Sequence, residues 1–287
     1  MSHELRTRVS TSIWQALTER SQTSGQSVSH IVQAALAEAL DIDHHSIFQV
    51  STSGAIVQGL YQGCVSVADL RRHGDVGLGT FEDLDGEMIL IDGRCYQARS
   101  DGTVVEAGDA ELTPFASVVN FAADRVVTLD RVTAFADLTG QLDGLRLSEN
   151  GIVAYRATGR FSSIDVRAAC KTESGIGLVD AVASQAMFHF EDLEATLVGF
   201  WSPEYTKAIS ISGYHLHAIS ADRAHGGHVL DLRVEDLHVE INDVNDFHLA
   251  IPETVEFLAA DLAGDHAEAL AVAELDPRTA STRPVPS

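Results

Sequence analysis

Four of the thirteen histidines of this chain fall between residues 215 and 228, at a spacing that suits a metal ion. His215 and His217 lie two residues apart in the apolar run 214–219, which predicts a β-strand. Because successive side chains of a strand alternate between its faces, both imidazoles point to one side, about 6 to 7 Å apart along the chain. Two neutral imidazole nitrogens at that spacing can reach one ion at about 2.0 to 2.1 Å. The pair is therefore a candidate metal-binding site.

A third ligand is expected from the strand that follows. The polar turn 220–227 separates the first strand from a second apolar strand that begins at His228. If the two strands pair as a hairpin, His228 completes a set of three histidines and leaves a fourth position open, as catalytic zinc sites do. His225 is the rival ligand, but it lies inside the turn, before two glycines. The alternative is a strand whose histidines are solvated or hydrogen-bonded and bind no metal.

The acidic composition limits the partners that the chain can bind. It has 287 residues, of which 45% are hydrophobic, which is enough to bury a substantial core in one or two domains. Its net charge of −23 repels nucleic acids and anionic membranes. An anionic substrate therefore needs a local cation to hold it, and a bound metal ion together with an arginine would supply one.

Cysteine content and hydropathy indicate the compartment. Cys64, Cys95 and Cys170 are scattered without a CxxC pair, which fits a reducing compartment and argues against a disulfide framework. The first residues lack an apolar signal core, and no run of about 18 apolar residues occurs. We expect a cytoplasmic protein that does not contact a membrane.

Residues 1–45 form a separate unit in the sequence. Residues 5–9 alternate apolar and polar side chains as a short strand does, and serines cap two helices that follow. This order resembles the ribbon-helix-helix module, whose strands pair across a dimer and can enter the DNA major groove, with Arg6 and Arg8 as the base-reading residues. The unit carries three basic and five acidic residues, a net charge of −2. We therefore expect it to form a dimer or higher oligomer rather than to bind DNA, with residues 41–45 as a solvated linker.

Strands and helices alternate between residues 46 and 276, and residues 277–287 are expected to be a disordered tail. Strands are expected at 46–52, 86–91, 94–99, 103–106, 115–121, 188–190, 195–200 and 229–241, with a pair of strands within 152–169. Helices are expected at 56–62, 66–72, 132–145, 174–184 and 265–275, and one more opens at Pro252 and Glu253. Residues 77–81 are expected to form a glycine-rich loop without the spacing or the lysine of a phosphate-binding loop.

Short motifs in this region resemble the alpha-acetolactate decarboxylase family. They are Gly79-Thr-Phe, Leu84-Asp-Gly-Glu-Met-Ile, Val166-Arg-Ala, Leu197-Val-Gly-Phe, Pro203-Glu-Tyr, Ser212-Gly-Tyr-His-Leu-His and Gly226-Gly-His-Val-Leu-Asp. They follow the family's order and spacing from about Ile47 to Glu274, and the two histidine motifs are the most specific. The unit 1–45 lies outside the resemblance.

The resemblance implies a zinc-dependent carboxy-lyase that converts 2-acetolactate to (R)-acetoin and carbon dioxide, in acetoin and butanediol biosynthesis. It implies that His215, His217 and His228 bind the Zn²⁺ ion. It also implies a mixed α/β fold in residues 46–276, with two mixed β-sheet subdomains, flanking helices and the metal site between the subdomains.

The same resemblance implies which residues act beside the metal. Glu87, Thr80 and Arg167 match the family's motifs, and a second glutamate comes from the C-terminal region, where Glu274 matches best and Glu268 stays open. Arginine suits a carboxylate that will leave as carbon dioxide, and a buried glutamate with a raised pKa suits protonation of the resulting enediolate. Thr80 would bind the substrate or align a glutamate. The substrate's own ketone accepts the electrons, so no thiamine or pyridoxal cofactor is required.

Two stretches depart from the family pattern, and two other functions are weighed against it. Residues 171–177 and Ala218 differ from the residues expected there, which affects the shape of the pocket. One alternative is a metal- or metabolite-sensing regulator whose unit 1–45 binds DNA, but Glu87 and Arg167 would be superfluous for it. The other is a cupin-like metal oxygenase, which would normally add a carboxylate to the metal ligands and would bind iron and consume oxygen.

Overall fold

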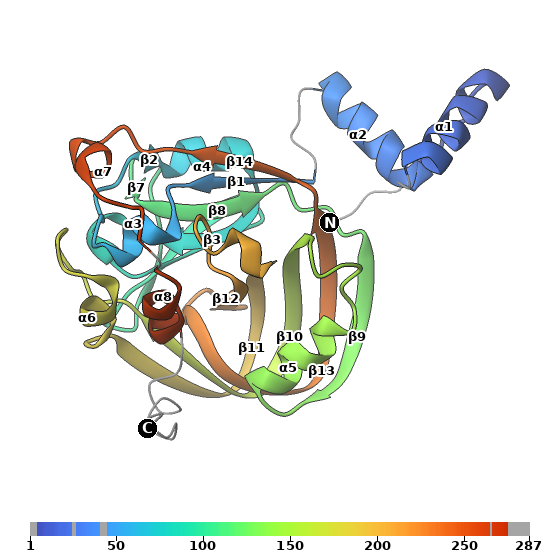
Figure 1. Ribbon diagram of the computed structural model, residues 1–287. Coiled ribbons are helices and arrows are strands. Elements are labelled where there is room, and N and C mark those ends of the chain that lie inside the picture. Colours follow the sequence, from blue (N-terminus) through green and yellow to red (C-terminus); the bar gives the residue numbers. More distant parts are fainter. Residues whose placement is uncertain (1–4, 25–26, 41–44, 265, 275–287) are drawn as a thin grey trace, which may run out of the picture.

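The computed structural model describes residues 5–24, 27–40, 45–264 and 266–274, and two β-sheets make up most of it (Figure 1). Helices flank the sheets, so the expected mixed α/β class is confirmed. The three cysteines are unpaired. Within the described ranges, no helix has the length and apolar character needed to cross a membrane.

The first sheet has seven strands in the order β14-β1-β8-β3-β4-β5-β6. β1 pairs with β14 in parallel and the other pairings are antiparallel, so this sheet is mixed. Its strands are β1 (Ser46–Val50), β3 (Val76–Thr80), β4 (Glu87–Ile91), β5 (Arg94–Ala98), β6 (Val104–Glu106), β8 (Phe115–Val119) and β14 (Asp246–Ala250). Asp92 and Gly93 both have positive φ in the two-residue turn between β4 and β5, as the Asp-Gly pair predicts.

The glycine-rich loop predicted at residues 77–81 is wrong, because residues 76–80 form β3, a buried strand inside the first sheet. A side chain has no room at Gly77, where a Cβ would lie 2.3 Å from the carbonyl oxygen of Ser117 on β8. The glycines therefore allow close approach of a neighbouring strand rather than a flexible loop.

The second sheet has five strands in the order β10-β11-β12-β13-β9, and β10 also pairs with β13. Strands β10 to β13 therefore close into a small barrel, which β9 extends, and all pairings are antiparallel. The strands are β9 (Arg125–Val132), β10 (Ile152–Ala168), β11 (Ala186–Ser202), β12 (Gly213–Ser220) and β13 (Gly226–Val244).

The sequence predicted a pair of strands within 152–169 and two separate strands at 188–190 and 195–200. Both predictions are wrong, because β10 and β11 are continuous. Each is one continuous strand of 17 residues instead of two short ones. β11 has a residue with positive φ, Asp192, and β10 has register shifts around Phe161 where it pairs with β13. Such bulges bend a strand without ending it, which lets it wrap around a barrel.

The predicted helices are present with shifted boundaries. α3 begins before Ile56, since the side chain of Thr52 accepts a hydrogen bond from the Ala55 N–H and caps it. α7 begins after Pro252, since Thr254 caps it, and the helix predicted at 174–184 is reduced to α6. The remaining elements are α1 (Thr11–Ser24), α2 (Val28–Leu40), α3 (Ser53–Val57), β2 (Val65–Ser66), α4 (Val67–His73), η1 (Glu82–Leu84), β7 (Leu112–Thr113), α5 (Phe135–Asp143), α6 (Leu178–Val182), η2 (Glu204–Thr206), α7 (Val255–Ala259) and α8 (Ala267–Glu274).

The two sheets share a hydrophobic core. One buried cluster joins Ile47, Leu78 and Ile89 of the first sheet to Val198 and Ile219 of the second. A separate cluster joins the strands of the second sheet to α5. Strands β4 and β12 are in contact across the shared core, so side chains at the ends of these strands can meet.

Helices α1 and α2 pack against one another and stand away from the body of the protein (Figure 1). Both were expected, whereas residues 5–10 form no strand within this single chain. Ile31 is buried in this unit, and Leu5, Trp14 and Leu40 are more than half exposed. The strands of a ribbon-helix-helix module pair between two chains, so a single chain does not test this pairing. The resemblance to that module stays a prediction.

The prediction of a solvated linker at 41–45 is wrong at His45. Its side chain is buried, and its Nδ1 lies 2.6 Å from the carbonyl oxygen of Asp243. Its main-chain oxygen accepts hydrogen bonds from the N–H groups of Asn245 and Asp246. The chain is therefore fixed to the body at this residue. Residues 41–44 and the tail 277–287 lie outside the described residues.

Candidate active site

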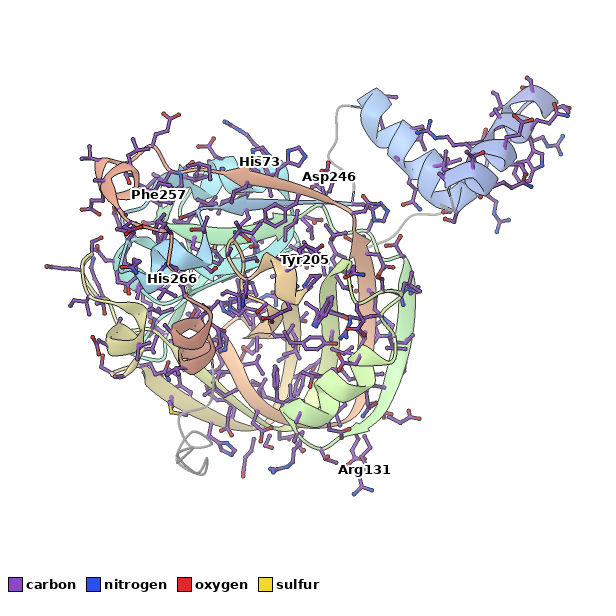
Figure 2. The ribbon with its side chains drawn as sticks, viewed as in Figure 1. His73, Arg131, Tyr205, Asp246, Phe257 and His266 are labelled. Atoms are coloured by element: carbon purple, nitrogen blue, oxygen red, sulfur yellow. The ribbon has the colours of Figure 1, made fainter. Side chains whose placement is uncertain are left out.

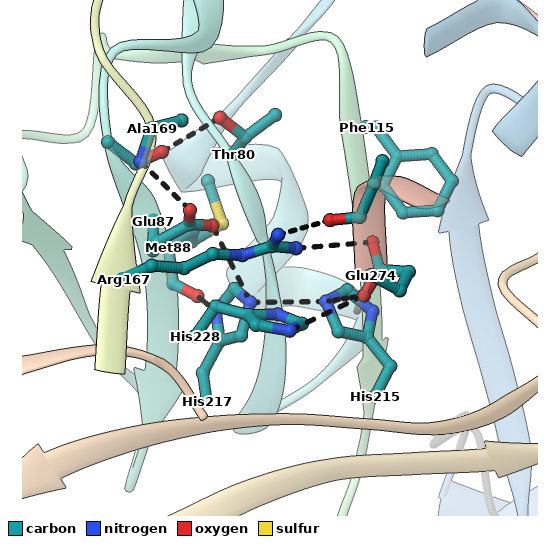
Figure 3. Close-up of polar contacts among 12 residues, drawn as sticks. Thr80, Glu87, Met88, Phe115, Arg167, Ala169, His215, His217, His228 and Glu274 are labelled. Atoms are coloured by element: carbon teal, nitrogen blue, oxygen red, sulfur yellow. Dashed lines mark hydrogen bonds and ion pairs between the residues drawn. The ribbon is translucent and has the colours of Figure 1, made fainter. Parts of the chain in front are cut away.

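The three histidines of the hairpin converge on one point. His215 and His217 project from β12, and His228 on β13 pairs directly with His217 across the ladder. One ring nitrogen from each lies within 4.8 Å of the others, and the Nε2 atoms of His215 and His217 are 3.2 Å apart (Figure 3). All three side chains are buried. This arrangement can bind a metal ion.

The protonation of these histidines suits ligation. The Nδ1 of His217 lies 2.9 Å from the carbonyl oxygen of Met88, so the Nδ1–H donates to that oxygen and Nε2 keeps its lone pair. Burial lowers the pKa of His215 and of His217 to about 3. The pKa of His228 is also held well below its usual range, first by burial and then by Arg167. Neutral imidazoles are the form that binds metal.

Glu87 reaches this cluster from the first sheet. It begins β4, opposite Thr80 at the end of β3. Its Oε1 accepts a hydrogen bond of 3.1 Å from the Ala169 N–H, and its Oε2 lies 3.6 Å from the Nε2 of His217. Burial raises the pKa of Glu87 to about 7, although Arg167 opposes this shift. A carboxyl group with that pKa can give or take a proton at neutral pH.

Thr80 supports the loop that precedes Glu87. Its side chain is buried, and its hydroxyl donates a hydrogen bond of 2.8 Å to the carbonyl oxygen of Gly86. Gly86 needs its positive φ of 83°, and a Cβ there would lie 2.3 Å from the Ala98 carbonyl oxygen. Thr80 therefore holds the residue next to Glu87 in place.

Arg167 and Glu274 complete the cluster. Arg167 lies on β10 opposite His228, and its guanidinium donates a hydrogen bond to the Ala273 carbonyl oxygen. Its Nη2 is 3.7 Å from Oε1 of Glu274, whose Oε2 lies 3.5 Å from the Nε2 of His228. Burial raises the pKa of Glu274, while Arg167 opposes the shift. The Oε2 atom is buried without a hydrogen bond, so it is available to a ligand or an ion.

Most of these groups line one pocket. Its polar lining includes Glu87, Arg167, His215, His228 and Glu274. The rest is mostly apolar and comes from Ile56, Leu84, Phe115, Leu178, Val182, Ile211 and Leu270. A pocket with apolar walls and a few convergent polar groups is typical of a site for a small molecule.

The structure brings together all seven predicted site residues: Thr80, Glu87, Arg167, His215, His217, His228 and Glu274. The rival His225 lies elsewhere, with its ring 4.5 Å from that of Phe190. The side chain of Glu268 lies outside the described residues. Sequence reasoning missed Met88, Ala169 and Ala273, which act through main-chain atoms that residue type does not reveal.

The segment that departs from the family pattern packs beside the pocket. Lys171 lies 3.5 Å from Asp83, and the Thr172 N–H donates to the Asp83 carbonyl oxygen. The Ser174 hydroxyl accepts a hydrogen bond from the Tyr61 N–H. Residues 171–174 therefore border η1, whose Leu84 lines the pocket. Ala218, the other departure, is buried.

Fold and site together define an enzyme with a buried pocket for a small molecule rather than a DNA-binding regulator. Comparison with known proteins makes this specific. A family model described as alpha-acetolactate decarboxylase matches residues 47–264. The chain is 38% identical to the alpha-acetolactate decarboxylase of Methanosarcina mazei, over 84% of each chain. It is 37% identical to that of Methylococcus capsulatus, over 85% of this chain and 95% of the relative.

Solved structures agree with the sequence comparison. The crystal structure of alpha-acetolactate decarboxylase from Bacillus subtilis strain 168 superimposes with a TM-score of 0.78 and 34% sequence identity. The match covers 80% of this chain and all of the Bacillus chain. The chain belongs to the alpha-acetolactate decarboxylase family and is a carboxy-lyase.

Proposed function

We propose that this protein converts 2-acetolactate to (R)-acetoin and carbon dioxide with a zinc ion at the three histidines, as a step of acetoin and butanediol biosynthesis. The observation that carries the proposal is the meeting of this triad with Glu87, Arg167 and Glu274 in one pocket of an alpha-acetolactate decarboxylase family member.

The residues present fit a metal ion. Three buried imidazoles converge, and the main-chain oxygen of Met88 fixes the tautomer of His217. The buried Oε2 of Glu274, which has no hydrogen bond, lies 3.5 Å from His228 and 3.9 Å from His215. Three imidazole nitrogens suit zinc and leave a fourth position open, as in catalytic zinc sites. When bound, the ion would act as a Lewis acid toward the charge that develops on the substrate oxygens.

Arg167 is the cation that a chain of net charge −23 needs in order to hold an anionic substrate. Its guanidinium lines the pocket and is fixed by the Ala273 carbonyl oxygen. A planar guanidinium can hold a carboxylate with two parallel hydrogen bonds, which sets the direction of the bond that breaks. We assign substrate-carboxylate binding to Arg167.

The two glutamates supply the proton. Departure of carbon dioxide leaves an electron pair that moves onto the ketone and gives an enediolate, which must be protonated on one carbon and one face. Burial raises the pKa of Glu87 and of Glu274 in this pocket, so both carboxyl groups hold a proton more readily than an exposed glutamate does. We assign proton donation to this pair and the alignment of Glu87 to Thr80, through its hydrogen bond to Gly86.

Chiral analysis of the product tests this assignment. The purified protein with zinc should release acetoin of the R configuration from racemic 2-acetolactate, because a fixed proton donor reaches one face only. A racemic product would contradict the assignment of the proton donors, and absence of acetoin would contradict the activity itself.

We also propose that the protein is a homodimer or a higher homo-oligomer assembled through residues 5–40. The N-terminal unit, residues 1–45, carries three arginines and five acidic residues, a net charge of −2, so the rest of the chain carries −21. Bodies of that charge repel one another, whereas the unit is almost neutral and exposes Leu5, Trp14 and Leu40. A two-helix unit of this size also has too small a core to be stable alone.

A cytoplasmic location is supported by the state of the cysteines. Cys64, Cys95 and Cys170 form no disulfide. Unpaired thiols, one of them buried at Cys95, suit a reducing compartment.

A further inference from the structure

The ring of His266 lies directly against the main chain of Gly54 in α3. A Cβ at Gly54 would lie 2.8 Å from Cδ2 and 3.5 Å from Nε2 of this imidazole. Gly264 borders the ring on another side, where a Cβ would lie 3.3 Å from Cε1. Figure 2 shows His266 in the space between α3 and α8. Gly54 is buried in the first turn of α3, and its lack of a side chain allows the close contact.

His266 also begins the helix that carries Glu274. Its carbonyl oxygen accepts the first hydrogen bond of α8, 3.0 Å from the Leu270 N–H. Leu270 and Ala273 of α8 share a buried cluster with Ile56 of α3. One end of α8 is therefore set by the imidazole against α3, and the other end enters the pocket.

The pocket depends on how α8 is seated. The helix supplies the Ala273 carbonyl oxygen that fixes Arg167, and the carboxylate of Glu274 beside His228. A rotation of the helix by one residue would turn Glu274 about 100° away from the histidines. The contacts that set the start of α8 thus decide the position of two groups in the pocket.

We infer that His266 is a positioning residue of the active site, whose ring packs against Gly54 and thereby seats α8 with Glu274 and the Arg167 anchor. Its effect on turnover rests on the proposed function, whereas its effect on α8 does not. The ring acts by shape rather than by a polar contact, since its Nε2 is buried without a hydrogen bond. A phenyl ring at residue 266 should therefore preserve the contact with Gly54, whereas a methyl group should not.

A double-mutant cycle between the two contacting residues tests the inference. Gly54→Ala and His266→Ala should each lower kcat by about tenfold or more, because a displacement of about 1 Å in a catalytic group is costly. Zinc should still bind, since neither residue touches the three histidines. The double variant should recover much of the lost activity, because the new methyl group occupies the space that the imidazole leaves. His266→Phe should stay close to the wild type, as should the control His248→Ala, whose exposed side chain contacts Asp246.

Hydrogen exchange of the α8 amides separates this inference from the proposed function. In His266→Ala the amides of α8 should exchange faster than in the wild type, and in His266→Phe they should not. Normal activity and normal α8 protection in both Gly54→Ala and His266→Ala would overturn the inference. Absence of decarboxylation by the wild-type protein would instead overturn the proposed function, and the exchange rates would still decide the role of His266.

Discussion

Glu87 and Glu274 enter the same pocket but are held in different ways. Glu87 begins a strand inside the first sheet and accepts a hydrogen bond from the Ala169 N–H. Glu274 is the last described residue of α8, and its Oε2 has no hydrogen bond. The first carboxyl group is fixed by the fold, whereas the second can respond to what occupies the pocket.

Replacement of Glu87 by glutamine should separate metal binding from proton transfer. Glutamine keeps the size of the side chain and can still accept from Ala169, but it cannot give a proton to the enediolate. We expect kcat to fall by about 10² to 10⁴-fold, the usual contribution of general acid catalysis, at unchanged zinc content. The measurements are steady-state kinetics and elemental analysis of the same preparation. Wild-type kcat in Glu87→Gln would contradict the role of this carboxyl group.

Glu87 should also affect the pH dependence of stability in the metal-free protein. Its pKa rises from 4.5 to about 7 on folding, so the folded state binds the proton more tightly. The stabilising contribution is present below about pH 4.5 and is lost as the pH rises through 7, by about 3 kcal/mol for a shift of this size. Urea unfolding at pH 5 and pH 7.5 measures it as the difference between wild type and Glu87→Gln. The histidines are common to both proteins, so a difference that does not fall with pH would contradict the raised pKa.

At the scale of the elements, close contact between β11 and β12 sets the direction of the histidines. A Cβ at Gly199 would lie 2.0 Å from the carbonyl oxygen of His215. We expect Gly199→Ala to force β12 away, to lower the free energy of unfolding by about 1 to 3 kcal/mol as overpacking does, and to reduce zinc occupancy. Gly140 in α5, with no atom within 4 Å of a Cβ, is the matched control, and Gly140→Ala should not lower either quantity. Full zinc occupancy in Gly199→Ala would show that the pairing of β11 with β12 tolerates the methyl group, and it would contradict this prediction.

The histidine hairpin could be predicted from the sequence because its signals are local. An apolar strand with histidines two residues apart, a glycine-containing turn and a third histidine at the next strand all fall within 214–228. The placement of Glu87 over His217 could not be predicted from such patterns, because it depends on β4 of one sheet packing on β12 of the other. The resemblance to a family supplied that residue, and local periodicity did not.

The predictions for β3 and β11 were wrong because they also depended on contacts between segments far apart in the sequence. Polar side chains in β11 and glycines in β3 suggest a break or a loop when they are read locally. In the fold, β11 bends at Asp192 without ending, and Gly77 allows the backbone of β8 to approach. Tertiary packing therefore determines that both segments are continuous strands.

At the scale of the whole molecule, charge is divided between a nearly neutral N-terminal unit and an acidic body. If the unit joins two chains, a charge placed at its exposed Trp14 should disrupt the assembly and leave the pocket intact. We expect Trp14→Glu to sediment as a monomer with wild-type kcat per chain. Leu147→Glu, at an exposed apolar side chain of the body, is the control and should sediment as the wild type does. A Trp14→Glu variant with the wild-type sedimentation coefficient would contradict assembly through this unit.

We propose that decarboxylation by this protein depends on a metal ion at the three histidines. The most direct measurement is acetoin release from 2-acetolactate by the purified protein, before chelation, after chelation and after zinc is restored. We predict activity that disappears with the metal and returns with zinc, and a folded His217→Ala variant that shows neither metal binding nor activity. Acetoin release that persists without metal, or a folded and zinc-loaded protein that releases none, would contradict the account.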